Sequence, residues 1–496
     1  MDSSLVRKYV IFFPVLLHIV LILGITVWTI NSLNSAIVPA YITFSILFLV
    51  STVFSLVNMT RFRAGVFYYL LNLMFLLGFW FKYSVKTLTG SALREAVGSF
   101  TFTPESEVRI LWVVIWGIFG FFVAQLLSYF IYKRKRLAQN VTESLNYKPA
   151  LYILLLSIAL SFLNLKFNVL LFGFKSDLVL PFKGNAIFFL LLTKGTLFLF
   201  FYYCLKDYSK RMIVIGAILA TICSVGVLSR MVIFIYFSAI FIFLLQQFYY
   251  WDLKKIIQNI AFCTVAFFAF SYITVFLSSG LRDVYSAKNT PPPVQQQQVE
   301  IAASSAPLEN HNDKASVLPS ISSPIVNSFN IEKQFKNYLE LAVGRWIGIE
   351  GVMAVDSYKG KSFSFLWEAL SEKSYHGNSF YTRISNPEIP IDRDLNKTIS
   401  TSVPGPVAFF YYTGNILFVF VAMFLSTFFL SLCENVAIKF FKNNQSVVVL
   451  ISSFLVGDFF QFGISPLAYL RYLSFSLLCV AFFYYVVEHN KKTSIK

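Results

Sequence analysis

Apolar segments about 20 residues long recur along almost the whole chain, and this pattern constrains the fold more than any other feature. A membrane-spanning helix needs roughly 20 mostly apolar residues. Hydrophobic residues make up 57% of the chain and charged residues 13%, whereas soluble domains carry roughly 25% charged residues. The sequence therefore predicts an all-α polytopic integral membrane protein. About twelve transmembrane helices are expected, at residues 9–30, 36–58, 65–83, 110–132, 150–172, 186–205, 212–228, 231–250, 259–279, 407–433, 446–463 and 472–488.

One long polar insertion, residues 281–404, separates the first nine expected helices (1–280) from the last three (405–496). Its segment 288–330 contains a run of three prolines and a run of four glutamines, a composition typical of a disordered linker. Segment 331–403 is expected to be partly helical. Its apolar residues between Ile331 and Met353 recur at steps of three and four, which predicts one amphipathic helix through 331–358.

Basic residues set the expected orientation. The net charge of +17 comes mostly from short loops after even-numbered spans and from both termini, whereas the insertion is nearly neutral. Because cytoplasmic loops are enriched in Lys and Arg, we expect both termini in the cytoplasm and the insertion outside, as a periplasmic loop. The charge is thus explained by the lipid bilayer, and no nucleic-acid partner is expected. The first apolar run, 9–30, lacks a small-residue cleavage site and is expected to be an uncleaved helix.

Arginines are the main candidates for substrate binding. Arg230 lies between two apolar spans, where a charge costs a few kcal/mol unless it is paired or reaches the interface. Since Arg makes planar, bidentate contacts to phosphate, one hypothesis is a site for a lipid diphosphate, and the other is an Arg that reaches the headgroups. Four more arginines are expected outside, where each alone is more typical of a salt bridge but all could line one anion-binding cleft: Arg282, Arg345, Arg383 and Arg471.

Glu350 and His376 are the candidate general bases in the external loop. An unperturbed His titrates near 6.5, which suits proton abstraction, although a lone loop His is more often a surface residue. Glu350 has the alternative of pairing with a nearby Arg. Lys194 and Asp458 fall inside apolar spans, where a structural ion pair between them is possible. The sequence contains no nucleotide-binding loop and no zinc-protease motif.

Several local segments resemble those of the Wzy-type O-antigen and capsular polysaccharide polymerases. The matching features are Ser229-Arg230 at a helix hairpin, the 281–404 loop, the R-x-x-x-x-E segment at Arg345 and Glu350, and Pro404-Gly405…Tyr411…Gly414. The resemblance implies a glycosyltransferase of the bacterial inner membrane that polymerises undecaprenyl-diphosphate-linked oligosaccharide repeat units on the outer face. It also implies a metal-independent reaction without cofactors and a chain-length-regulating co-polymerase as partner. The alternatives are an O-antigen ligase that transfers glycan to lipid A core, and a repeat-unit flippase or other transporter, which the long external loop disfavours.

Overall fold

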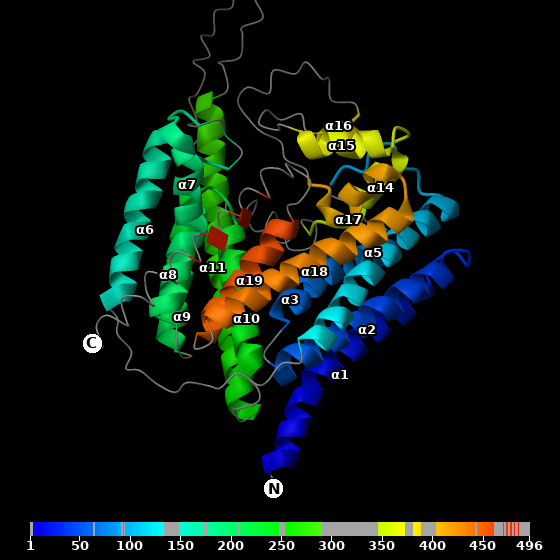
Figure 1. Cartoon of the computed structure of the whole chain (residues 1–496), viewed down its shortest axis with the longest axis horizontal. Coiled ribbons are helices and arrows are strands. Elements are labelled where there is room, and N and C mark those ends of the chain that lie inside the picture. The colour runs from blue at the N-terminus through cyan, green and yellow to red at the C-terminus, as the bar shows by residue number, and fades with distance from the viewer. Residues whose placement is uncertain are drawn as a thin grey trace, which may run out of the picture.

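A computed structural model describes most of the chain, and every regular element in the described residues is a helix (Figure 1). The described residues are 3–62, 65–90, 93, 95–132, 148–172, 174, 176–205, 209–247, 253–289, 346–372, 380–387, 403–441, 444–460 and scattered residues between 470 and 485. The helices before the polar insertion are α1 (Ser3–Ile30), α2 (Val38–Phe62), α3 (Val66–Phe75), η1 (Leu76–Phe81), α4 (Lys82–Thr89), α5 (Pro104–Ile131), α6 (Lys148–Phe167), η2 (Pro181–Lys183), α7 (Gly184–Leu190), η3 (Leu191–Gly195), α8 (Thr196–Tyr203), α9 (Lys210–Gly226), α10 (Met231–Gln247) and α11 (Leu253–Asn289). Those in and after it are α14 (Ile349–Ser357), α15 (Phe363–Ser371), α16 (Phe380–Ser385), α17 (Gly405–Phe410), η4 (Tyr411–Thr413), α18 (Ile416–Phe440) and α19 (Gln445–Phe460).

The expectation of a polytopic helical membrane protein is confirmed. Among the described residues, seven helices are long and apolar enough to cross a membrane: Val38–Thr60, Val66–Thr89, Pro104–Ile131, Lys148–Phe167, Gly184–Tyr203, Lys254–Tyr285 and Ile416–Phe440. Three shorter apolar helices are Pro14–Ile30, Met231–Gln246 and Gln445–Phe460. The total of twelve spans and their orientation stay predictions, and the segment expected at 472–488 lies mostly outside the described residues.

The helices form one elongated bundle (Figure 1). Helices α6 to α9 and α11 lie on one side, α1, α2, α5 and α18 lie on the other, and α3, α10 and α19 lie between them. The short helices α14 to α17 gather at one end, next to the start of α5 and α18, and the N-terminus lies at the opposite end. We call the end that carries α14 to α17 the loop end.

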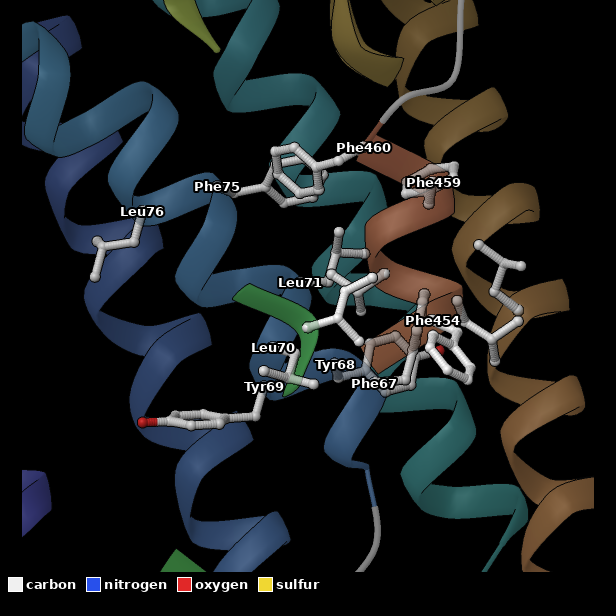
Figure 2. Packing of buried hydrophobic residues seen from close by; sticks show 14 of the residues in the cluster. Phe67, Tyr68, Tyr69, Leu70, Leu71, Phe75, Leu76, Phe454, Phe459 and Phe460 are labelled. Carbon is white, nitrogen blue, oxygen red and sulfur yellow. The ribbon is translucent and has the colours of Figure 1, made fainter. Parts of the chain in front are cut away.

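Helix α3 and the end of α19 form the centre of the bundle (Figure 2). Most residues of α3 are buried, as expected for a helix that is apolar all round. The rings of Phe75 and Phe460 face each other with centroids 5.2 Å apart. The buried Glu434 of α18 accepts a hydrogen bond from the backbone N–H of Phe67 at 3.0 Å. A carboxylate at this position satisfies a donor in the first turn of α3 and complements the helix dipole.

Buried amides and small residues join the neighbouring helices. Asn72 of α3 and Gln125 of α5 both donate to the Ser55 hydroxyl of α2, at 3.3 and 2.7 Å, the kind of contact that binds helices inside a bilayer. Helices α5 and α18 approach closely because Gly120 has no side chain. A Cβ there would lie 2.3 Å from the carbonyl oxygen of Phe420.

Two predicted helix boundaries were wrong. Helix α11 does not end near residue 279 but continues to Asn289, because Leu281 and Tyr285 pack against the buried cluster of Leu171, Phe174 and Leu228. The tenth span was expected to begin at 407. The long helix instead begins at Ile416, after the buried α17 and η4, because Gly414 is left-handed and ends the preceding turn.

The continuous helix predicted through 331–358 was also wrong. Residues 346–348 are not helical, and α14 begins only at Ile349. Gly348 packs directly on the backbone of Gly78, where a Cβ would lie 1.9 Å from the Gly78 carbonyl oxygen. This backbone contact keeps the segment out of a helix, and it prevails over the apolar periodicity that favoured one.

Candidate functional site at the loop end

Arg230 lies in the turn between α9 and α10. Its Nη2 donates to the Ser279 hydroxyl of α11 at 2.9 Å, and its side chain is partly buried. A guanidinium anchored in this way is oriented before any ligand arrives, which is the arrangement that favours anion binding. The structure therefore places the first candidate residue where three helices meet.

Arg282 holds the turn that carries Arg230. Its guanidinium donates to the carbonyl oxygen of Leu228 through Nη2 at 2.6 Å and through Nε at 3.1 Å, and to that of Phe172 at 3.3 Å. Leu228 has a left-handed backbone, with φ 52°, which costs roughly 1–3 kcal/mol for a residue other than glycine. Arg282 thus stabilises a strained turn, and we assign it a positioning role.

Glu350 pairs with a lysine that the sequence interpretation passed over. The Lys82 Nζ lies 2.5 Å from Glu350 Oε1, and the two side chains are only 5% and 2% exposed. Burial raises the pKa of Glu350, and the adjacent Lys82 ammonium opposes this by favouring the carboxylate. Because the carboxylate is enclosed and paired, the geometry favours a docking role for Glu350. Its assignment as a general base stays a prediction.

Trp346 connects this ion pair to α10. Its carbonyl oxygen accepts a hydrogen bond from Lys82 Nζ at 2.7 Å, and its ring lies 6.3 Å from that of Phe234, one turn along α10 from Arg230. Lys82 directly follows the π-helical segment η1. Such segments are frequent at functional sites, and here η1 receives the extended backbone at Gly348. We call Lys82, Arg230, Trp346 and Glu350 the loop-end cluster.

A second clamp fixes the other end of α14. Asp356 accepts three hydrogen bonds from Arg109 of α5, at 2.7 to 3.0 Å, and one from the Tyr411 hydroxyl at 3.2 Å. Lys361 donates to the carbonyl oxygens of Val355, Asp356 and Tyr358. A cation at these last carbonyls complements the helix dipole, so α14 is held at both ends.

The suggested pair of Lys194 and Asp458 is present. Lys194 Nζ lies 2.5 Å from Asp458 Oδ2, and Lys194 belongs to the second π-helical segment, η3. The neighbouring Gly457 lets Met231 of α10 pack closely, since a Cβ would lie 2.8 Å from the Met231 Cε. Asp458 therefore lies on a helix that packs against the start of α10, next to Arg230.

Glu372 is a titratable group that the sequence interpretation missed. It follows α15, and its carboxylate accepts a hydrogen bond from the backbone N–H of Phe380 at 2.9 Å. Burial raises the pKa of Glu372 to about 6, although the Phe380 N–H and the Arg383 guanidinium lower it. A carboxyl that titrates near neutrality is suited to proton transfer. Arg383 itself is exposed and stacks on the Phe380 ring at 4.5 Å.

The remaining candidates, Arg345, His376 and Arg471, lie outside the described residues. The structure joins Lys82 to both Glu350 and Trp346 and packs the Trp346 ring near Phe234, one turn of α10 from Arg230. Arg282 holds the turn that carries Arg230, and Arg383 lies on α16. Lys82 gave one usable signal, which is a lysine at the end of an otherwise apolar span. Glu372 gave none, because its raised pKa depends on packing.

Within the described part of the chain, no group of three or more His, Cys, Asp or Glu side chains is arranged to hold a metal ion. Comparison with known proteins gives no family: no protein-family profile, curated protein or solved structure matches the chain. The class defined so far is a polytopic helical membrane protein with a charged cluster at one end of its bundle.

Proposed function

We propose that the protein is a membrane glycosyltransferase that polymerises lipid-diphosphate-linked oligosaccharide repeat units at its loop end, on the outer face of the bacterial inner membrane. The observation that carries this proposal is the anchored guanidinium of Arg230, fixed by Ser279 and by the Arg282 clamp on Leu228. It lies in the same part of the bundle as the docked loop segment at Trp346. The sequence resemblance to O-antigen polymerases supports the same assignment.

The proposed reaction forms one glycosidic bond and breaks one sugar–phosphate bond. The acceptor hydroxyl of a new lipid-linked unit attacks the anomeric carbon of the growing chain. The bond from that carbon to the lipid diphosphate breaks, and the diphosphate leaves with the bonding electron pair. Arg230 would neutralise the charge that develops on this leaving group. The hydroxyl proton passes to a base, for which Glu372 joins Glu350 and His376 as candidates.

Stabilising the leaving diphosphate requires both the charge and the planar shape of the Arg230 guanidinium. Lys at this position keeps the charge but cannot make the bidentate contact. A preorganised donor of this kind is worth roughly 10²–10³-fold in rate. Arg230→Ala should therefore abolish long polymer while the protein still inserts, and Arg230→Lys should restore it only in part.

Reconstitution with lipid-linked repeat units tests the proposal and separates its rivals. A ladder of products supports a polymerase, whereas transfer to lipid A core would identify a ligase, and translocation without bond formation would identify a transporter. Lys359→Ala removes an exposed charge from the same loop and serves as the matched control. Normal ladders from Arg230→Ala would refute the diphosphate role, and no transfer product from the unaltered protein would refute the glycosyltransferase assignment.

A further inference from the structure

Helix α15 has a buried apolar inner face and two large exposed aromatic residues on its outer side. Its inner face is buried: the Phe365 ring packs against those of Phe380 and Tyr412, with centroids 5.5 and 5.1 Å apart. Its outer face carries Phe363 and Trp367, which are 57% and 73% exposed. These two residues are four positions apart and so lie on the same side of the helix. A helix in water with a bare aromatic face of this kind needs a covering partner.

The outer face of α15 continues an exposed apolar stripe of α18. The Phe363 ring contacts the Phe418 ring edge to face, with centroids 5.3 Å apart. The neighbouring Leu417 begins a row of exposed side chains at every fourth position, followed by Val421, Leu425 and Phe429. Since α18 is long and apolar enough to cross a membrane, this row is its lipid-facing side. The α15 face therefore adjoins a surface that already faces lipid.

The start of α18 indicates how deep α15 lies in the membrane. Asn415 caps that helix by accepting a hydrogen bond from the Phe418 N–H, and the left-handed Gly414 precedes it. Charged side chains at Lys359 and Glu368 are exposed nearby. Aromatic residues beside charged ones, at the entry of a span, are the composition of the headgroup region.

A second aromatic element is exposed at the same end, on the far side of the bundle. The segment that joins α6 to α7 lies at the loop end in Figure 1. Within it, Phe182 is 97% exposed and Val179 is 82% exposed. Two separate exposed apolar elements at one end, on opposite sides of the bundle, fit one planar surface better than one protein partner.

We propose that α15 inserts its Phe363–Trp367 face into the headgroup region of the bilayer at the loop end, so that the loop helices are held on the lipid surface. The occupant of this face is lipid, as it is for the adjoining row on α18. The inference is independent of the proposed glycosyltransferase activity, because it rests only on the exposed faces of α15 and α18. The helix would lie roughly 5–10 Å into the boundary between headgroups and acyl chains.

Spin-label accessibility in lipid nanodiscs tests this placement. A nitroxide is attached at Trp367→Cys, or at Lys359→Cys as the matched control, on a background with the five natural cysteines replaced. Oxygen concentrates in lipid and a nickel chelate stays in water. The label at 367 should relax at least about threefold more with oxygen than with nickel, and the label at 359 should show the reverse, as interfacial insertion requires.

A second measurement uses the natural side chain. Fluorescence quenching by lipids brominated near the glycerol end of the acyl chain is compared between the unaltered protein and Trp367→Phe. The component lost in Trp367→Phe should be quenched more strongly by these lipids than by lipids brominated deeper in the chain. A 367 label open to nickel would refute the proposal by placing the face in water. A label closed to both relaxants would refute it by showing a protein partner or a second copy on this face.

Discussion

Replacing Lys82 while keeping Glu350 tests whether a buried ion pair docks α14. Lys82→Met keeps the length of the side chain and removes its charge, which leaves an enclosed carboxyl without its partner. Removing one member of a buried pair costs about 3–5 kcal/mol, and the bond to the Trp346 carbonyl is lost as well. Since 1.4 kcal/mol is a factor of ten in an equilibrium, local opening of α14 should become roughly 10²- to 10⁴-fold more frequent.

The same variant should be sensitive to pH. Burial already raises the pKa of Glu350, and loss of the opposing ammonium raises it further. A carboxyl whose folded pKa exceeds its unfolded value near 4.3 adds stability that is complete below that value and is lost as pH rises through the folded pKa. Lys82→Met should therefore be less stable at pH 8 than at pH 5.

Hydrogen exchange of the α14 amides, measured in nanodiscs, gives the opening frequency directly. The matched control is Lys86→Met on α4, the helix that also carries Lys82. Lys86 lies 3.6 Å from Glu107 and is more exposed, so its replacement should cost no more than about 1 kcal/mol of stability. Lys82→Met/Glu350→Gln removes both charges and should recover most of the protection. Protection of α14 that is unchanged in Lys82→Met, or a double variant no better than the single one, would refute the reasoning.

Three further predictions concern topology, titration and packing. A reporter fused after Lys255 should read cytoplasmic and one within 290–330 should read external; the opposite pair of readings would invert the orientation. Burial raises the pKa of Glu372 to about 6. The protection of the α16 amides from hydrogen exchange should therefore fall by about 1 kcal/mol, after discounting for solvent screening, as pH rises from about 4.5 through about 6. Glu372→Gln should lack this step, and a step that persists in that variant belongs to another group. Gly348→Ala should lower the melting temperature, because overpacking costs about 1–3 kcal/mol and its Cβ would strike the Gly78 backbone. Gly24→Ala places no atom within 4 Å of the new Cβ, so it should leave the melting temperature unchanged. A Gly348→Ala variant that melts at the same temperature as Gly24→Ala would argue against the backbone contact.

The sequence was most informative where the signal is local. Hydropathy located the long apolar helices, because lipid requires about 20 apolar residues wherever the chain crosses it. The cost of a charge in lipid also identified Lys194 and Asp458 as possible partners, and the structure pairs them.

Apart from the Lys194–Asp458 pair, contacts between distant segments were not predictable. The Lys82–Glu350 and Arg109–Asp356 pairs each join residues more than 240 positions apart. No local sequence pattern indicated either pairing. The non-helical backbone at 346–348 was missed for a related reason. Periodicity describes which residues are apolar, whereas this segment is shaped by backbone packing against Gly78. Glu372 was missed because burial alone gives it an unusual pKa.

The placement of α14 separates two ways in which activity can fail. Two clamps attach α14 to different helices, Glu350 to α4 and Asp356 to α5, and Trp346 just before it reaches α10. Under the proposed function, a variant that loosens a clamp loses polymer because the loop segment no longer packs on α10 near Arg230. Arg230→Ala should lose polymer while α14 stays protected from hydrogen exchange, and Lys82→Met should lose both together. Loss of α14 protection in Arg230→Ala would mean that Arg230 is part of the scaffold, and the diphosphate role would then need another residue.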